Sequence, residues 1–196
     1  MFELKFLEEL QSIAGKYEFK KDLISEMRVQ GKNLIQYVLP ALDRYFDKYE
    51  VVSVEEPLYE DMSFLSLDKK FKGFIDLVVK TSDGKYHVID WKTCSWGWNM
   101  KRKSDKITTY QLTLYKKFYA LKYNVDMSNI ETHFALLKRT AKKENVEIFK
   151  VSSGEKKTTN ALDLLKRAVY NIDHGLKIKN RSSCRNCEFY KTEHCR

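Results

Sequence analysis

The sequence is poor in residues that interrupt a chain and in segments that could cross a membrane. Two prolines and seven glycines among 196 residues argue against long flexible linkers. No apolar stretch reaches the roughly 18 residues of a membrane-spanning helix, and the first residues, with Glu3, Glu8 and Glu9, are unlike a secretory signal. No Gly-x-x-x-x-Gly-Lys-Ser/Thr loop is present, so the sequence shows no helicase motor. We expect a cytoplasmic protein of one domain, with room for a small appendage and no membrane partner.

Positive charge is in excess along the chain. Lys and Arg number 36 against 27 Asp and Glu, which gives a net charge of +9 and a sequence pI near 9.2. Such a charge favours polyanionic partners through steering and counterion release. It indicates a nucleic-acid partner but does not by itself identify DNA.

Two acidic strand segments carry the strongest chemical signal. Residues 71–80 and 86–92 are rich in β-forming residues and are joined by Asp83-Gly84, which favours a tight turn. Because side chains alternate along a strand, Asp90 and Lys92 point to one face. Asp76 can face them from the neighbouring strand.

Two converging carboxylates form a hard oxygen site that suits Mg²⁺ or Mn²⁺. A lysine beside them can position the attacking water and offset charge that develops on a phosphate. Asp76, Asp90 and Lys92 would together supply the parts of a phosphodiester hydrolase.

The Asp/Glu-x-Lys triplet alone is weak, because it begins at Glu3, Glu18, Asp68, Asp83, Asp90 and Glu155. The plainer interpretation of such residues is a solvated strand edge. Only the triplet at Asp90 ends a strand with buried character that follows a Gly-x-x-Asp segment, which favours catalysis.

Three motifs in order resemble the PD-(D/E)XK nuclease superfamily and, within it, the RecB-like exonuclease branch. They are Gly73-x-x-Asp76, then Asp90-Trp91-Lys92-Thr93, then Gln111-x-x-x-Tyr115. The resemblance implies a restriction-endonuclease-like core, metal held by Asp76, Asp90 and the backbone carbonyl of Trp91, and Gln111 near the catalytic lysine or the DNA backbone. Small lysine-rich members of the branch resemble phage recombination or repair nucleases, which implies a bacterial or phage-infected cell.

The chain departs from the family on an earlier helix. The family usually has a segment resembling Gly-x-x-x-His there, and Gly31 is followed by Ile35 where the histidine would fall. The first metal ligand is therefore unassigned, with Glu26, Gln36 and Glu56 as weak candidates.

The third motif lies on a predicted helix over residues 104–123, which contains no Pro or Gly and can be capped by Ser104. Gln111 and Tyr115 are one turn apart on one face. Tyr115 is either a core aromatic or a DNA contact, whereas a glutamine in an apolar stripe is harder to explain structurally.

Aromatic and basic residues follow the site directly. One interpretation is that these residues bind single-stranded nucleic acid. Bases would stack on the aromatic rings, and phosphates would pair with the cations. The alternative is a loop whose tryptophans cover the core while its lysines stay in water. The residues are Trp96, Trp98, Lys101, Arg102, Lys103 and Lys106.

The last residues form a cysteine-rich tail with Cys184, Cys187 and Cys195. The tail resembles part of the iron-sulfur cage of some RecB-like nucleases, including CRISPR-adaptation nucleases. Three alternatives stay open: a [4Fe-4S] cluster with Cys94 or a non-cysteine ligand, a Zn²⁺ site that includes His194, or reduced thiols.

The overall prediction is an α/β fold with a central mixed β-sheet flanked by helices. Helices are expected at 2–14, at 20–49 with a break or bend near Gly31 and Pro40, at 104–123 and at 159–174, and later strands at 130–137 and 146–151. We expect a nuclease domain over 1–180 and the cysteine-rich tail over 181–196.

The predicted function is Mg²⁺- or Mn²⁺-dependent hydrolysis of DNA at single strands or duplex ends, by an exonuclease of recombination or repair. Two alternatives remain. One is a non-catalytic nucleic-acid-binding module on the same fold, and the other is a structure-specific endonuclease.

Overall fold

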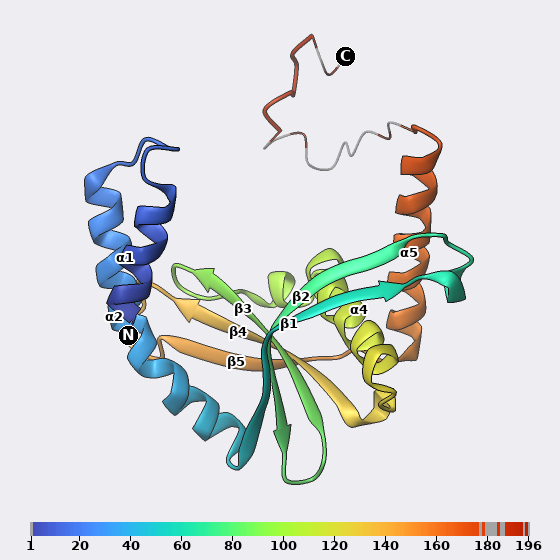
Figure 1. The fold of residues 1–196 in the computed structure, drawn as a ribbon, viewed down its shortest axis with the longest axis horizontal. Helices are drawn as coiled ribbons and strands as arrows, with labels where there is room; N and C mark the ends of the chain where they lie inside the picture. The colour runs from blue at the N-terminus through green and yellow to red at the C-terminus, as the bar shows by residue number, and fades with distance from the viewer. Residues whose placement is uncertain (1, 177, 179–183, 185–186, 194, 196) are drawn as a thin grey trace.

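A five-stranded mixed sheet with helices on both faces forms the centre of the molecule (Figure 1). The computed structural model describes residues 2–176, 178, 184, 187–193 and 195. The strands lie in chain order: β1 (Tyr49–Asp61), β2 (Lys70–Thr81), β3 (Tyr86–Cys94), β4 (Ile130–Lys138) and β5 (Val146–Val151). Only β3 and β4 are parallel. The predicted fold class is confirmed.

The parallel pair requires a crossover, because a tight turn joins only antiparallel neighbours. The crossover runs through α3 (Met100–Lys103), α4 (Lys106–Tyr123) and the short helix η2 (Met127–Asn129). A second short helix, η1 (Ser63–Leu65), joins β1 to β2. The predicted turn at Asp83-Gly84 is confirmed, with Gly84 at a φ of +82°.

Each face of the sheet has its own core. In one core, Val88 and Phe134 of the sheet pack with Phe118 of α4, and α5 (Glu155–Asp173) adds to the cover. On the other face, α2 (Lys21–Phe46) covers Ile89 and Ala135. Adjacent residues of β3 therefore enter opposite cores, as strand alternation requires. This two-sided burial makes β3 an enclosed support for a site.

The second helix is not broken, since residues 21–46 form one helix that contains Pro40. The alternative of a bend stays a prediction. Gly31 is a packing position, since a Cβ there would lie 2.3 Å from the Phe2 ring of α1 (Phe2–Ile13). Helix packing thus explains the glycine. No helix within the described ranges is long and apolar enough to span a bilayer.

Two predicted helix starts also need correction. Asp105, rather than Ser104, caps α4, because its carboxylate accepts a hydrogen bond from the backbone N–H of Thr108. Helix α5 begins earlier than predicted, after Gly154. Ile107, in the first turn of α4, is exposed.

A buried histidine pair on the α2 side of the sheet predicts a pH-dependent stability. Burial, together with His87, lowers the pKa of His133 to about 3, whereas an unfolded histidine titrates near about 6.5. Below about pH 6.5 the His133 imidazole takes up a proton in the unfolded chain but stays neutral in the folded chain. The free energy of unfolding therefore falls as pH falls. Denaturant unfolding in EDTA should show this loss between about pH 6.5 and 5, above the range of ordinary carboxylates.

The variant His133→Gln should show a much weaker decline over that interval. An equally steep decline in this variant would contradict the assignment of the pH dependence to the pair.

Candidate active site

The candidate site lies where the alternation of side chains between the two faces of the sheet is interrupted along β2. Ile75 and Val78 both pack into the core under α4, although strict alternation would place residues three apart on opposite faces. Leu77 and Val79 pack into the other core. Opposite Asp76 on β1, Glu55 has a φ of +52°, so the irregularity involves both strands. The strand twists at Asp76.

Asp76 lies where the regular pairing of β2 with β3 ends. The paired residues run from Lys80↔Tyr86 to Leu77↔Ile89. Beyond them the carboxylate of Asp76 accepts a hydrogen bond from the backbone N–H of Trp91, with Oδ2 and N 2.6 Å apart. The side chain thus replaces a strand carbonyl as the acceptor that this N–H requires.

Asp90 and Lys92 share the face of β3 that α4 covers, as predicted. Asp90 is only 2% exposed, and its Oδ2 lies 2.7 Å from Lys92 Nζ. Lys92 is thus the partner of this buried oxygen, and no other hydrogen-bond donor among the described residues reaches it.

Burial raises the pKa of Asp90; Lys92 counteracts this effect and the charge of Asp76 adds to it. A divalent cation would fit these donors, since it would neutralise two neighbouring carboxylates and offset the burial of Asp90. Asp76 and Asp90 are thus able to hold a metal ion together.

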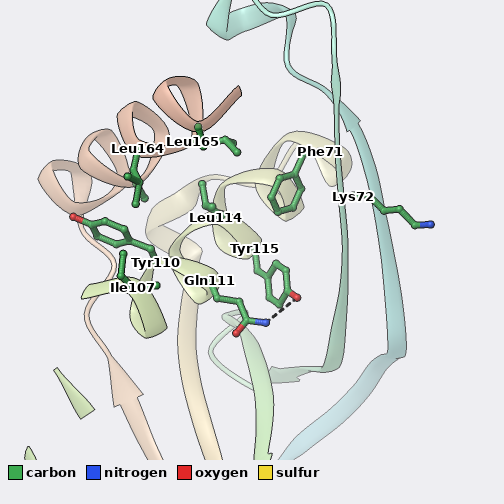
Figure 2. A pocket seen from close by; sticks show the side chains of 11 residues that line it. Phe71, Lys72, Ile107, Tyr110, Gln111, Leu114, Tyr115, Leu164 and Leu165 are labelled. Atoms are coloured by element: carbon green, nitrogen blue, oxygen red, sulfur yellow. Dashed lines mark hydrogen bonds between the residues drawn. The ribbon is translucent and has the colours of Figure 1, made fainter. Parts of the chain in front are cut away.

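Helix α4 supplies the third part of the site. Gln111 Oε1 accepts a hydrogen bond from Lys92 Nζ at 3.1 Å, and its Nε2 donates to the Tyr115 hydroxyl at 3.0 Å (Figure 2). Tyr115 packs against β2, where a Cβ on Gly73 would lie 2.8 Å from its ring. The absence of a side chain at Gly73 therefore allows the close approach that places Gln111 beside Lys92.

An apolar groove adjoins this chain of contacts (Figure 2). It has a volume of about 400 Å³ and lies between β2, α4 and α5. Gln111 and Tyr115 line it, so one end lies next to Lys92. Its other walls are Phe71, Lys72, Ile107, Tyr110, Leu114, Ala161, Leu164, Leu165 and Ala168.

The candidates for a further metal ligand are engaged elsewhere. Glu56 binds Lys122 and Tyr123 at the far end of α4. Burial acts to raise its pKa, but these hydrogen bonds outweigh burial and lower it. Glu26 is exposed and accepts a hydrogen bond from Gln30, and Gln36 donates to a backbone carbonyl of its own helix. Ile35 is exposed.

The predicted DNA-contact residues divide into three groups by their exposure. Trp96 is 72% exposed, and Lys101, Arg102 and Lys106 are also exposed. Trp98 and Tyr115 are instead core residues, with 7% and 9% exposure. The ring of Trp98 packs edge-on against Phe134, and Gly73 leaves space for the ring of Tyr115. Lys103 is half-buried against Phe149 and paired with Glu147, so its charge is largely compensated.

The described residues show no metal centre assembled around a cysteine. Cys94 ends β3 and is half-buried, and all four cysteines are free of disulfides. The described residues contain no cysteine in a group of three or more close metal-binding side chains. His194 lies outside the described residues, so the three alternatives for the tail stay predictions.

One cluster escaped the sequence analysis. His87, Glu131 and His133 meet on the face of the sheet opposite Asp90. The spacing of Glu131 and His133 was a usable signal, since residues two apart on a strand share a face. The place of His87 in this cluster follows only from the pairing of β3 with β4, which the sequence does not give.

The sheet, the strand separation at Asp76, and the Asp90–Lys92 pair define a restriction-endonuclease-like nuclease core. The chain belongs to the PD-(D/E)XK nuclease superfamily, whose family model matches residues 7–192. That family membership supports a hydrolytic nuclease with a nucleic-acid substrate.

A solved structure shares the fold at low sequence identity. A protein from Eubacterium rectale named "Putative exonuclease" is 16% identical, with a TM-score of 0.58 over 98% of this chain and 68% of that one. A structure named SSO0001 is also 16% identical, with a TM-score of 0.48 over 95% of this chain and 77% of that one. No curated protein matches the chain.

The contact between Gly73 and Tyr115 predicts a sensitive position. Gly73→Ala should lower the unfolding free energy by about 1–3 kcal/mol, because the added Cβ overpacks a buried ring. Displacement of Gln111 should also reduce any DNA cleavage by about 10- to 100-fold. Denaturant unfolding and a cleavage assay measure the two effects.

Gly154→Ala is the matched control, since nothing lies within 4 Å of the added Cβ. Its cost should stay below about 1 kcal/mol. Equal effects of the two substitutions would contradict the packing role of Gly73.

Proposed function

We propose that the protein is a metal-dependent deoxyribonuclease of the RecB-like branch, and that it acts as an exonuclease. The observation that carries this proposal is the buried carboxylate of Asp90 beside Asp76 and Lys92. The order of the three motifs along the chain supports the branch. A role in recombination or repair and a phage origin belong to the same proposal.

Asp76 and Asp90, with the Trp91 carbonyl, would hold Mg²⁺ or Mn²⁺. Such an ion lowers the pKa of bound water and offsets phosphate charge. The N–H of Trp91 keeps the Asp76 carboxylate directed at the site. Lys92 would orient the water and donate to a phosphate oxygen, and Gln111 would keep the ammonium group in place.

DNA would reach the site across the exposed segment that follows β3. Trp96 offers a free ring for base stacking, and Lys101, Arg102 and Lys106 offer charges for phosphates. The excess of positive charge supports the same partner. This combination suits single strands or frayed ends.

A non-catalytic binding module is the second candidate. It is favoured by α2, which provides no carboxylate in contact with Asp76, Asp90 or Lys92 within the described residues. An endonuclease on the same fold is distinguished from an exonuclease by its substrate, because only an endonuclease cuts covalently closed circular DNA.

Removal of Lys92 tests catalysis. End-labelled single- and double-stranded DNA should be degraded by the parent only with Mg²⁺ or Mn²⁺, and Lys92→Ala should slow degradation by about 10²-fold or more. Lys122→Ala is a matched control, because Lys122 is similarly half-buried and pairs with a nearly buried carboxylate outside the site. It should retain cleavage.

Lack of any degradation by a folded parent that still binds DNA would establish the binding module instead. Cleavage preserved in Lys92→Ala would remove Lys92 from the mechanism.

The two nearby tryptophans should respond in opposite ways. Trp96→Ala should weaken binding to single-stranded DNA by about 1–3 kcal/mol and change the unfolding free energy by less than about 0.5 kcal/mol. Trp98→Ala should cost about 3–5 kcal/mol of stability, because it empties a core position. Fluorescence anisotropy and denaturant unfolding separate these results. Unchanged DNA affinity in Trp96→Ala would exclude the stacking role.

A further inference from the structure

The face of β3 opposite the catalytic carboxylates carries two facing histidines. His87 Nδ1 and His133 Nε2 lie 3.0 Å apart, and both side chains are buried. Nitrogens that share a tetrahedral zinc ion lie about 3.3 Å apart, given Zn–N bonds of about 2.0–2.1 Å. The two rings thus already have nearly the spacing of metal ligands.

The parallel register of β3 and β4 creates this arrangement. His87 is paired with Glu131, and His133 lies two residues further along β4 on the same face. Glu131 Oε2 lies 3.9 Å from His87 Nδ1. All three ligand atoms lie within 4.8 Å of one another.

The carboxylate of Glu131 divides its two oxygens between different partners. Oε1 binds Lys150 at 2.7 Å and Lys85 at 3.4 Å. Oε2 is the oxygen that lies 3.9 Å from His87 Nδ1. The lysines therefore hold the carboxylate through one oxygen and leave the other beside His87. The carboxylate of Asp83 adds a second negative charge near Lys85.

The outer ring nitrogens have partners that suit metal-bound histidines. His87 Nε2 lies 2.8 Å from the Thr81 hydroxyl, and His133 Nδ1 lies 3.4 Å from the Tyr45 hydroxyl. A hydroxyl can accept from a ring N–H, so both outer nitrogens can carry the protons while both inner nitrogens offer lone pairs. Such contacts orient ligand histidines and set their tautomer.

A cavity of about 440 Å³ gives access to the cluster. Tyr45, Thr81, His87, Glu131 and His133 are among its lining residues. It has room for a water molecule as a fourth ligand and provides a path for entry.

We propose that His87, His133 and Glu131 form a second, zinc-class metal site, separate from the catalytic carboxylates. The ion would take the place of the proton that the two imidazoles share, and nitrogen and carboxylate donors suit Zn²⁺. The bound ion fastens β3 to β4 on the α2 side. It thereby stabilises the strand that carries Asp90 and Lys92 on its other face.

A simple hydrogen-bonded pair of neutral histidines is the competing interpretation. It predicts no bound metal and no dependence on Glu131. Direct metal binding separates the two.

The test is calorimetric titration of the full chain with Zn²⁺ in excess Mg²⁺, after Cys184→Ser, Cys187→Ser and Cys195→Ser have removed the tail thiols. One equivalent should bind and raise the thermal midpoint. Glu131→Gln should weaken binding by at least about 10-fold to 100-fold, and His87→Gln with His133→Gln should abolish it. Asp76→Asn is the control and should bind as the parent does.

Co²⁺ serves as a spectroscopic probe of the same chain and should give visible bands of nitrogen and oxygen coordination without thiolate charge transfer. Absence of binding in the folded parent would overturn the site. Binding that survives Glu131→Gln but is lost in Asp76→Asn would also overturn it, because the ion would then occupy the catalytic carboxylates. Glu131 is only partly buried, so its variant keeps the test valid if the histidine variants fail to fold. None of these outcomes depends on nuclease activity.

Discussion

The hydrogen bond from the Trp91 N–H to the Asp76 carboxylate is the contact on which the site depends. Strands β2 and β3 separate at this point, and a buried N–H left without a partner would be costly. The aspartate supplies the acceptor and is thereby held beside Asp90 and Lys92. Helix α4 packs on this face of β3, and Gln111 contacts Lys92 there. One local break in pairing thus fixes the position of the Asp76 carboxylate.

The two faces of β3 carry different chemistry. Asp90 and Lys92 point toward α4, whereas His87 points toward α2 and meets Glu131 and His133 of β4. Figure 1 shows α1 and the first part of α2 on one side of the strand separation, and α5 with the long arms of β1 and β2 on the other. A strand covered on both faces is rigid enough to fix the positions of the Asp90 carboxylate and the Lys92 ammonium group. A metal ion bound at the proposed histidine site would therefore stabilise the same backbone that carries Asp90 and Lys92.

Sequence reasoning succeeded where local pattern decides the outcome. Asp90 and Lys92 share a face because they are two apart on a strand, and the Asp83-Gly84 turn follows from residue type. It failed where tertiary packing decides. Trp98 and Trp96 are equally aromatic in sequence, yet only the former finds a place against Phe134. Gly31 suggests a break, but it serves contact with Phe2. The interrupted alternation at Asp76 and the contact of His87 with Glu131 depend on how neighbouring strands pair. The sequence of one strand alone does not give that pairing.

Anomalous diffraction from crystals soaked in Mn²⁺ would test the central claim most directly. The account predicts a peak between the carboxylates of Asp76 and Asp90, on the α4 face of β3, which is absent from crystals of Asp76→Asn. Crystals of the parent protein with no peak at these carboxylates, at Mn²⁺ concentrations that saturate related metal sites, would contradict a metal-dependent nuclease site here.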